Sequence, residues 1–239
     1  MSKNLEWPHR GGVPDWDALY RARGNEVPLA RPIFTGDVFT DVHLPGPTGT
    51  IKERSVIVLQ HPCSMRTNGI DLAWQVLVAE VAKRKEIDEP GWVDGNFNLM
   101  PLPNLRPEVT NQRKHQAANF DNLHTVAPDL LTLSARMAAL SPLGVNLLLQ
   151  RWVHFSSRVI VPTQLFHEQT VAFYEEADLI EEWCEESDGY DVRSAGESCL
   201  EWLRTERDGT TYQQMLRNPQ SHSLVRKAMR AEIRERSQK

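Results

Sequence analysis

The chain has 239 residues, of which 40% are hydrophobic and 25% charged, and its net charge is −5. This composition is typical of a folded globular protein and excludes a disordered chain. No run of 18 apolar residues occurs and Met1–Arg10 lacks an apolar core, so we expect neither a transmembrane helix nor a secretory signal. The cysteines Cys63, Cys184 and Cys199 are odd in number and widely spaced, which predicts a cytoplasmic protein without a disulfide framework.

The first 31 residues show no clear hydrophobic period and are predicted to form an N-terminal arm. One short helix is expected there, after Pro14, with Asp15 as its N-cap. Strand patterns then follow through residue 126, and no helix pattern separates them. Strands that follow one another without a helix pair antiparallel, so we expect a small barrel or sandwich. The predicted strands are Gly36–Val42, Arg54–Gln60, Trp74–Val81, Phe97–Leu102 and Phe120–Val126.

From residue 127 the apolar period becomes helical. The stretch 128–140 is read as helical, and Ser141 followed by Pro142 predicts the start of another helix. Thr163 is predicted to begin a long helix with one acidic face, and shorter helices are expected over 195–206, 210–217 and 220–236. The predicted class is therefore α+β: an arm over 1–31, a small antiparallel β-barrel over 32–126 and a helical region over 127–239.

Charge is distributed unevenly along the helical region. Residues 168–201 carry twelve acidic residues and one basic residue, whereas residues 204–239 carry nine basic and four acidic residues. One interpretation is that the acidic segment and the basic tail pack together or face solvent. The other is that the tail contacts nucleic-acid phosphates. The residues predicted for such contacts are Arg226, Lys227, Arg230 and Arg234.

Segment 35–82 resembles the start of the MazF/PemK toxin family. The resemblance rests on Gly36-Asp37-Val38-Phe39, the loop Pro45–Gly49, the strand Arg54–Leu59 and the later strand Val76–Ala79. It implies an SH3-like barrel, a metal-independent endoribonuclease that needs no cofactor, frequent homodimers and a protein antitoxin as partner. It also implies that Arg54 supports phosphoryl chemistry. Val81 and Ala82 stand where the family has a hydroxyl residue, which keeps a non-catalytic module open as the alternative.

The loop after the second strand holds the densest group of reactive side chains. His61, Cys63, Ser64 and Arg66 lie within six residues. RNA cleavage through the 2′-hydroxyl needs proton transfer, which His61 could supply, and a cation for the phosphorane charge, which Arg54 or Arg66 could supply. The same residues could also simply pack at the barrel rim, and a Cys63 nucleophile is a further alternative. No Cys-x-x-Cys or His-x-x-x-His pair occurs, so no metal site is predicted.

The sequence thus predicts a MazF/PemK-like protein that acts on nucleic acid in a toxin or defence system. Its catalytic residues would be Arg54, His61 and Arg66, and its partners RNA and an antitoxin protein. The alternative is a binding module that uses the same barrel to hold a protein partner or nucleic acid.

Overall fold

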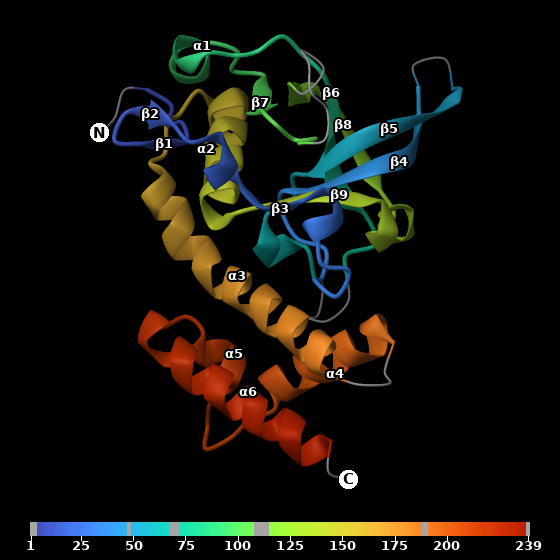
Figure 1. Ribbon diagram of the computed structural model, residues 1–239, viewed down its shortest axis with the longest axis vertical. Coiled ribbons are helices and arrows are strands. Elements are labelled where there is room, and N and C mark those ends of the chain that lie inside the picture. Colours follow the sequence, from blue (N-terminus) through green and yellow to red (C-terminus); the bar gives the residue numbers. More distant parts are fainter. Residues whose placement is uncertain (1–3, 47–48, 67–71, 108–114, 188–190, 238–239) are drawn as a thin grey trace. The chain divides into compact units, whose positions relative to one another are not determined.

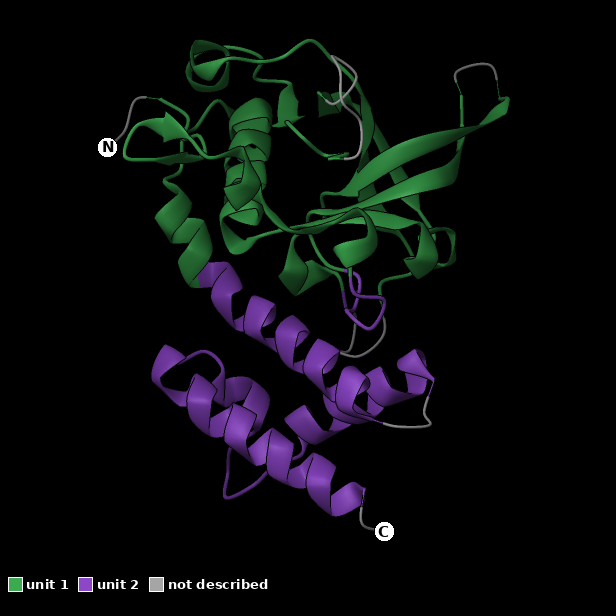
Figure 2. Cartoon of the chain, viewed as in Figure 1, with its two compact units in different colours: residues 1–27, 34–65, 72–168 green, residues 28–33, 66–71, 169–239 purple. Residues whose placement is uncertain are grey.

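A computed structural model of the chain describes residues 4–46, 49–66, 72–107, 115–187 and 191–237. The chain divides into two compact units (Figure 2). The first comprises residues 1–27, 34–65 and 72–168, and the second comprises residues 28–33, 66–71 and 169–239.

The first unit is built on a curled, antiparallel half-barrel sheet (Figure 1). Its seven strands follow the order β3-β9-β4-β5-β6-β8-β7. A separate two-stranded sheet pairs β1 with β2 near the N-terminus. The strands are β1 (His9–Arg10), β2 (Val13–Pro14), β3 (Tyr20–Arg23), β4 (Asp37–Pro45), β5 (Ile51–Val58), β6 (Val76–Lys83), β7 (Leu99–Leu102), β8 (Gln116–Val126) and β9 (Arg136–Leu140).

The centre of the sheet is apolar on both faces. Val56, Ile57 and Val58 are all fully buried although their side chains alternate in direction, as expected for the unbroken β-branched run in the sequence. Helix α2 (Pro142–Ser157) starts where predicted, because the Ser141 side chain accepts from the Gly144 amide. Gly144 also allows a close approach, since a Cβ there would lie 2.2 Å from the Leu19 carbonyl oxygen.

Helix α2 carries a buried cation that anchors the chain before β7. The Arg151 side chain is fully buried and donates to the carbonyl oxygens of Trp92 (2.7 Å), Asn96 (2.8 Å) and Leu99 (2.6 Å). Burial lowers the pKa of Arg151 to about 10, because a low-dielectric environment penalises the charged form. Carbonyl dipoles therefore stabilise this charge and fix short α1 (Glu89–Val93) and the loop after it.

The sheet extends beyond the segment predicted to form it. Strands β3 and β9 lie outside 32–126. The helical interpretation of 128–140 is wrong for residues 136–140, since β9 pairs with both β3 and β4, and residues 128–130 and 133–135 form only short 3₁₀ helices. The sequence Arg-Met-Ala-Ala-Leu favours a helix locally, but tertiary contacts override that preference. One such contact is the buried ion pair of Arg136 with Asp37, whose nitrogen and oxygen lie 2.9 Å apart.

The second unit is helical, as predicted for this part of the chain. Helix α3 (Thr163–Glu186) runs from the first unit into the second, and α4 (Val192–Arg204), α5 (Tyr212–Met215) and α6 (His222–Arg236) follow. These helices share one apolar core, to which Leu179, Trp183, Cys199, Leu203 and Met229 belong. No helix in the described ranges combines the length and apolar character needed to cross a membrane.

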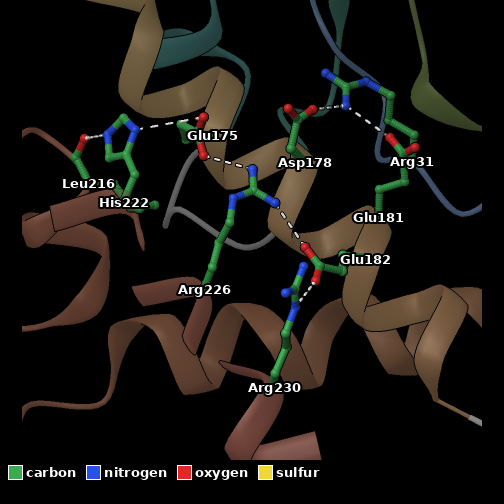
Figure 3. Close-up of polar contacts among 9 residues, drawn as sticks. All are labelled: Arg31, Glu175, Asp178, Glu181, Glu182, Leu216, His222, Arg226 and Arg230. Carbon is green, nitrogen blue, oxygen red and sulfur yellow. Dashed lines mark hydrogen bonds and ion pairs between the residues drawn. The ribbon is translucent and has the colours of Figure 1, made fainter. Parts of the chain in front are cut away.

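The segment 28–33 belongs to this second unit and contributes a buried cation to it. Arg31 is 1% exposed and donates to the carboxylates of Asp178 and Glu181 on α3 (Figure 3). Its guanidinium also lies 4.8 Å from the centre of the Tyr174 ring. Arg31 therefore pairs with the acidic helix although it precedes its two partners by 147 and 150 residues in the sequence.

Candidate functional site

A groove of about 520 Å³ opens on the first unit where the β4–β5 hairpin, β6 and β8 meet. We call it the β5–β8 groove. Most of its polar lining comes from three neighbouring strands, β5, β6 and β8. Its lining residues are Leu44, Pro45, Gly46, Lys52, Arg54, Glu80, Asp121, Asn122, Leu123 and His124.

A histidine, a carboxylate and an arginine make a connected row in this groove. His124 Nε2 lies 2.9 Å from Glu80 Oε1, and the other oxygen of Glu80 lies 3.6 Å from Arg54 Nε. Strand register explains the row, because Val56 pairs with Glu80 and Val78 pairs with His124. Residues two apart on a strand share a face, so the three polar side chains emerge on the same side of the sheet.

An irregularity in β8 shapes the far wall of the groove. Ala79 pairs with Leu123, but the next residue of β6, Glu80, pairs with Asn119, so the chain between these partners bulges out of the ladder. The bulge brings Asp121 and Asn122 into the lining. Asp121 accepts a hydrogen bond from the Asn98 side-chain amide, which fixes its carboxylate. The groove thus combines cations with carboxylates.

This arrangement can transfer a proton next to a bound anion. A carboxylate only accepts hydrogen bonds, so His124 donates Nε2–H to Glu80, and the second ring nitrogen, Nδ1, can then take a proton. Glu80 orients the ring through this hydrogen bond. Arg54 and Lys52 lie in the same lining and can bind a phosphate. In the described part of the chain, no three His, Cys, Asp or Glu side chains are grouped as metal ligands.

The structure separates two of the predicted catalytic residues, Arg54 and His61, along β5. Arg54 lines the groove, whereas His61 follows the opposite end of β5, and the strand from Arg54 to Val58 alone spans about 13 Å. Arg66 is assigned to the second unit. Arg54 therefore contacts Glu80, and through it His124, rather than His61.

His61 has a local partner instead. Its Nδ1 lies 2.9 Å from Cys63 Sγ and accepts from the Cys63 backbone amide at 3.3 Å, as the N-cap of a short 3₁₀ turn. Burial lowers the pKa of His61, since desolvation disfavours the charged imidazole. The contact between the two side chains matches the geometry that the alternative of a Cys63 nucleophile requires, but no third group orients the ring among the described residues.

The sequence interpretation missed Glu80 and His124, although each left a signal. Glu80 is an acidic residue within an otherwise apolar predicted strand, and His124 occupies one face of the last predicted strand. Their contact depends on the β6–β8 register, which joins residues 44 apart in the sequence. A single sequence gives no information on that register.

The basic tail is paired with the acidic helix. Arg226 on α6 donates to Glu175 and Glu182 on α3, both at 2.8 Å, and Arg230 donates to Glu182 at 2.6 Å (Figure 3). These contacts favour packing of the acidic and basic segments over phosphate binding by the same side chains. Lys227 and Arg234 are exposed, and neither forms a salt bridge with another residue that the structure describes.

Replacing Glu182 with Gln should lower the stability of the second unit by about 1 kcal/mol. The carboxylate is 17% exposed and is the acceptor for both Arg226 and Arg230, so the change weakens two charge-assisted bonds at once. Urea unfolding measures the effect, and it should shrink at high salt. Glu197→Gln is the control, because the Glu197 side chain is 48% exposed and pairs with Arg193 four residues earlier on the same helix. An equal effect of both substitutions would contradict the importance of the cluster.

Comparison of this chain with protein-family models and with curated proteins finds no match.

Proposed function

We propose that the first unit binds RNA in the β5–β8 groove and cleaves it without a metal ion. The observation that carries the proposal is the contact of Glu80 with both His124 and Arg54 inside one groove. In this proposal the curled antiparallel sheet is a divergent SH3-like barrel of the MazF/PemK kind. The resemblance of residues 35–82, and the presence of Arg54 in the groove, support that assignment.

The reaction needs one base, one anion site and solvent. His124 Nδ1 takes the proton of a ribose 2′-hydroxyl, and the 2′-oxygen forms a bond to the adjacent phosphorus. The bond from phosphorus to the 5′-oxygen breaks, and that oxygen takes a proton from water. The products are a 2′,3′-cyclic phosphate and a 5′-hydroxyl. Arg54 and Lys52 stabilise the charge on the phosphorus oxygens, and Glu80 stabilises the imidazolium.

The proposed biological role is that of a toxin or defence nuclease. An antitoxin protein that covers the β5–β8 groove would be its natural regulator, and a second copy of the chain is a further partner that the family resemblance suggests. The groove is of a size that a small ligand or a peptide side chain can also occupy.

A non-catalytic module that binds a protein partner in the same groove is the second candidate. Glu80 and Asp121 place two carboxylates in the lining, which offset Lys52 and Arg54 and weaken the attraction for a polyanion. Such a mixed lining favours a protein surface that carries both signs of charge.

An RNA cleavage assay in EDTA separates these two functions. The purified protein is incubated with RNAs of varied sequence, and Arg54→Ala is expected to lower the rate about 100-fold, because it removes a cation at the developing charge. Glu80→Gln should lower the rate and change its pH profile, because the ring of His124 loses its charged partner. Arg10→Ala, at an exposed arginine on β1, is the matched control.

Two outcomes would contradict the nuclease. Unchanged cleavage by both variants would place the activity elsewhere or in a contaminant. Absence of cleavage by the unaltered protein at concentrations well above micromolar would favour the binding module.

A further inference from the structure

A second hollow, of about 310 Å³, lies at the part of β4 that precedes the groove. We call it the β4 hollow. It exists because both ladders of β4 are irregular there: the register shifts between Phe39 and Val42 toward β5, and between Val38 and Phe39 toward β9. Such irregularities bend a strand and redirect side chains. The hollow is lined by Gly24, Thr40, Asp41, Leu105, Arg106 and Met137.

The backbone of Asp41 adopts an unusual conformation at this place. Its φ is 58°, a left-handed value that is uncommon outside glycine and is tolerated best by Asn and Asp. The Thr40 hydroxyl donates to Asp41 Oδ2 at 2.8 Å and so holds one carboxylate oxygen. The irregularity therefore presents a fixed carboxylate in the lining of the hollow.

Arg106 supplies the opposite charge to the same lining. Its Nε is buried and has no hydrogen-bond acceptor among the residues that the structure describes. Asp41 and Arg106 line the same hollow. Arg106 is only partly buried as a whole, so its guanidinium group can offer donors to a ligand in the hollow.

We propose that the β4 hollow binds a guanine base of the RNA substrate. Guanine presents adjacent N1–H and N2–H donors, which match the two oxygens of Asp41, and it presents the O6 and N7 acceptors, which match a guanidinium fork such as Arg106. Leu105 and Met137 provide apolar contact for the ring faces. Adenine has the reverse pattern, with an acceptor at N1 and a donor at N6. Cytosine and uracil each offer the carboxylate only one donor group.

The β4 hollow and the β5–β8 groove follow one another along β4. Asp41 lines the hollow and Leu44 lines the groove, three residues further along β4, or about 10 Å. The inference rests on the proposed function for its RNA substrate, and it adds base specificity to that function.

Binding to RNA that cannot be cleaved tests the inference. The probes are oligouridylates with 2′-O-methyl groups and one central G, A, C or U, and affinity is measured by fluorescence anisotropy. The G probe should bind about tenfold tighter than the others, the ratio that one good bidentate base contact supplies. Asp41→Asn should remove this preference, since it replaces one of the two acceptor oxygens with an NH2 donor that cannot pair with N1–H or N2–H, and Asn tolerates the same φ. Arg106→Gln should remove it as well.

Asp208→Asn is the matched control, because Asp208 is also an exposed aspartate with a left-handed φ, 49°, and lies in the second unit. It should leave the preference intact. Equal binding of the four probes, or a G preference that survives Asp41→Asn, would overturn the inference. If the protein preferred free GMP over AMP but bound the four probes equally, the hollow would bind a free guanine nucleotide, and its assignment to RNA would be wrong.

The probes lack the reactive hydroxyl, so the readout is independent of catalysis. If the protein prefers the G probe but cleaves no RNA, the guanine site is supported and the proposed nuclease activity is contradicted. If the protein cleaves RNA but binds the four probes equally, the nuclease activity is supported and the guanine site is contradicted.

Discussion

Replacing His124 with Ala should reduce RNA cleavage by about 100- to 10,000-fold, the range that general base catalysis supplies. In the proposed reaction His124 is the group that takes the 2′-hydroxyl proton, and Glu80 lies 2.9 Å from its Nε2 to hold the ring and its charge. The rate is measured by single-turnover cleavage in EDTA. Affinity for RNA with 2′-O-methyl groups should change little, because Arg54 and Lys52 remain in the groove.

Two other histidines make this experiment decisive. His61→Ala should leave the rate near that of the unaltered protein, because His61 lies beyond the opposite end of β5 from the groove. His43→Ala, at a 58% exposed histidine on β4, controls for the loss of a surface imidazole. If His61→Ala strongly lowered the cleavage rate and His124→Ala did not, the active site would lie in the loop after β5 and its assignment to the β5–β8 groove would be wrong.

Replacing Arg151 with Met should destabilise the first unit by about 3–5 kcal/mol. Met fills a similar length but donates no hydrogen bond, so the carbonyls of Trp92, Asn96 and Leu99 lose their common donor in the interior. Urea unfolding followed by fluorescence measures the loss, and the midpoint should shift at constant slope.

Arg151→Lys separates charge from geometry. Lys keeps the positive charge but has no rigid fork of donors, so it cannot reach all the carbonyl oxygens at once, and most of the destabilisation should remain. Arg10→Met, at an exposed arginine, should stay within about 0.5 kcal/mol of the unaltered protein. Full stability of Arg151→Lys would show that the charge alone matters.

The parts of the fold that depend on local sequence could be predicted. The run Val56–Leu59 identified a central strand, and Asp15 and Ser141 identified two helix starts, because a cap and its helix lie within a few residues. The α+β class is confirmed, with a curled antiparallel half-barrel sheet and helices toward the C-terminus.

The parts that depend on distant contacts could not be predicted. Helix α3 begins at Thr163 as expected, but its first amide is bonded to the side chain of Glu6, 157 residues away. Strand β9 has a helix-forming composition and becomes a strand through pairing with β3 and β4. The candidate site has the same origin, since Arg54 was visible as a strand residue while its link to His124 through Glu80 follows from register.

Arg31 has a consequence for how this protein can be divided. In sequence order, residues 28–33 belong to the second unit although most of the first unit follows them, and the chain returns to the first unit at residue 34. A single cut in the gene near residue 168 would therefore deliver a C-terminal fragment whose Asp178 and Glu181 have lost their buried cation. Two like charges would remain on α3 at a place where a guanidinium belongs. The helical unit is built from three separate stretches of the chain, residues 28–33, 66–71 and 169–239, and a fragment that keeps the buried cation of Asp178 and Glu181 needs the first of them as well as the last.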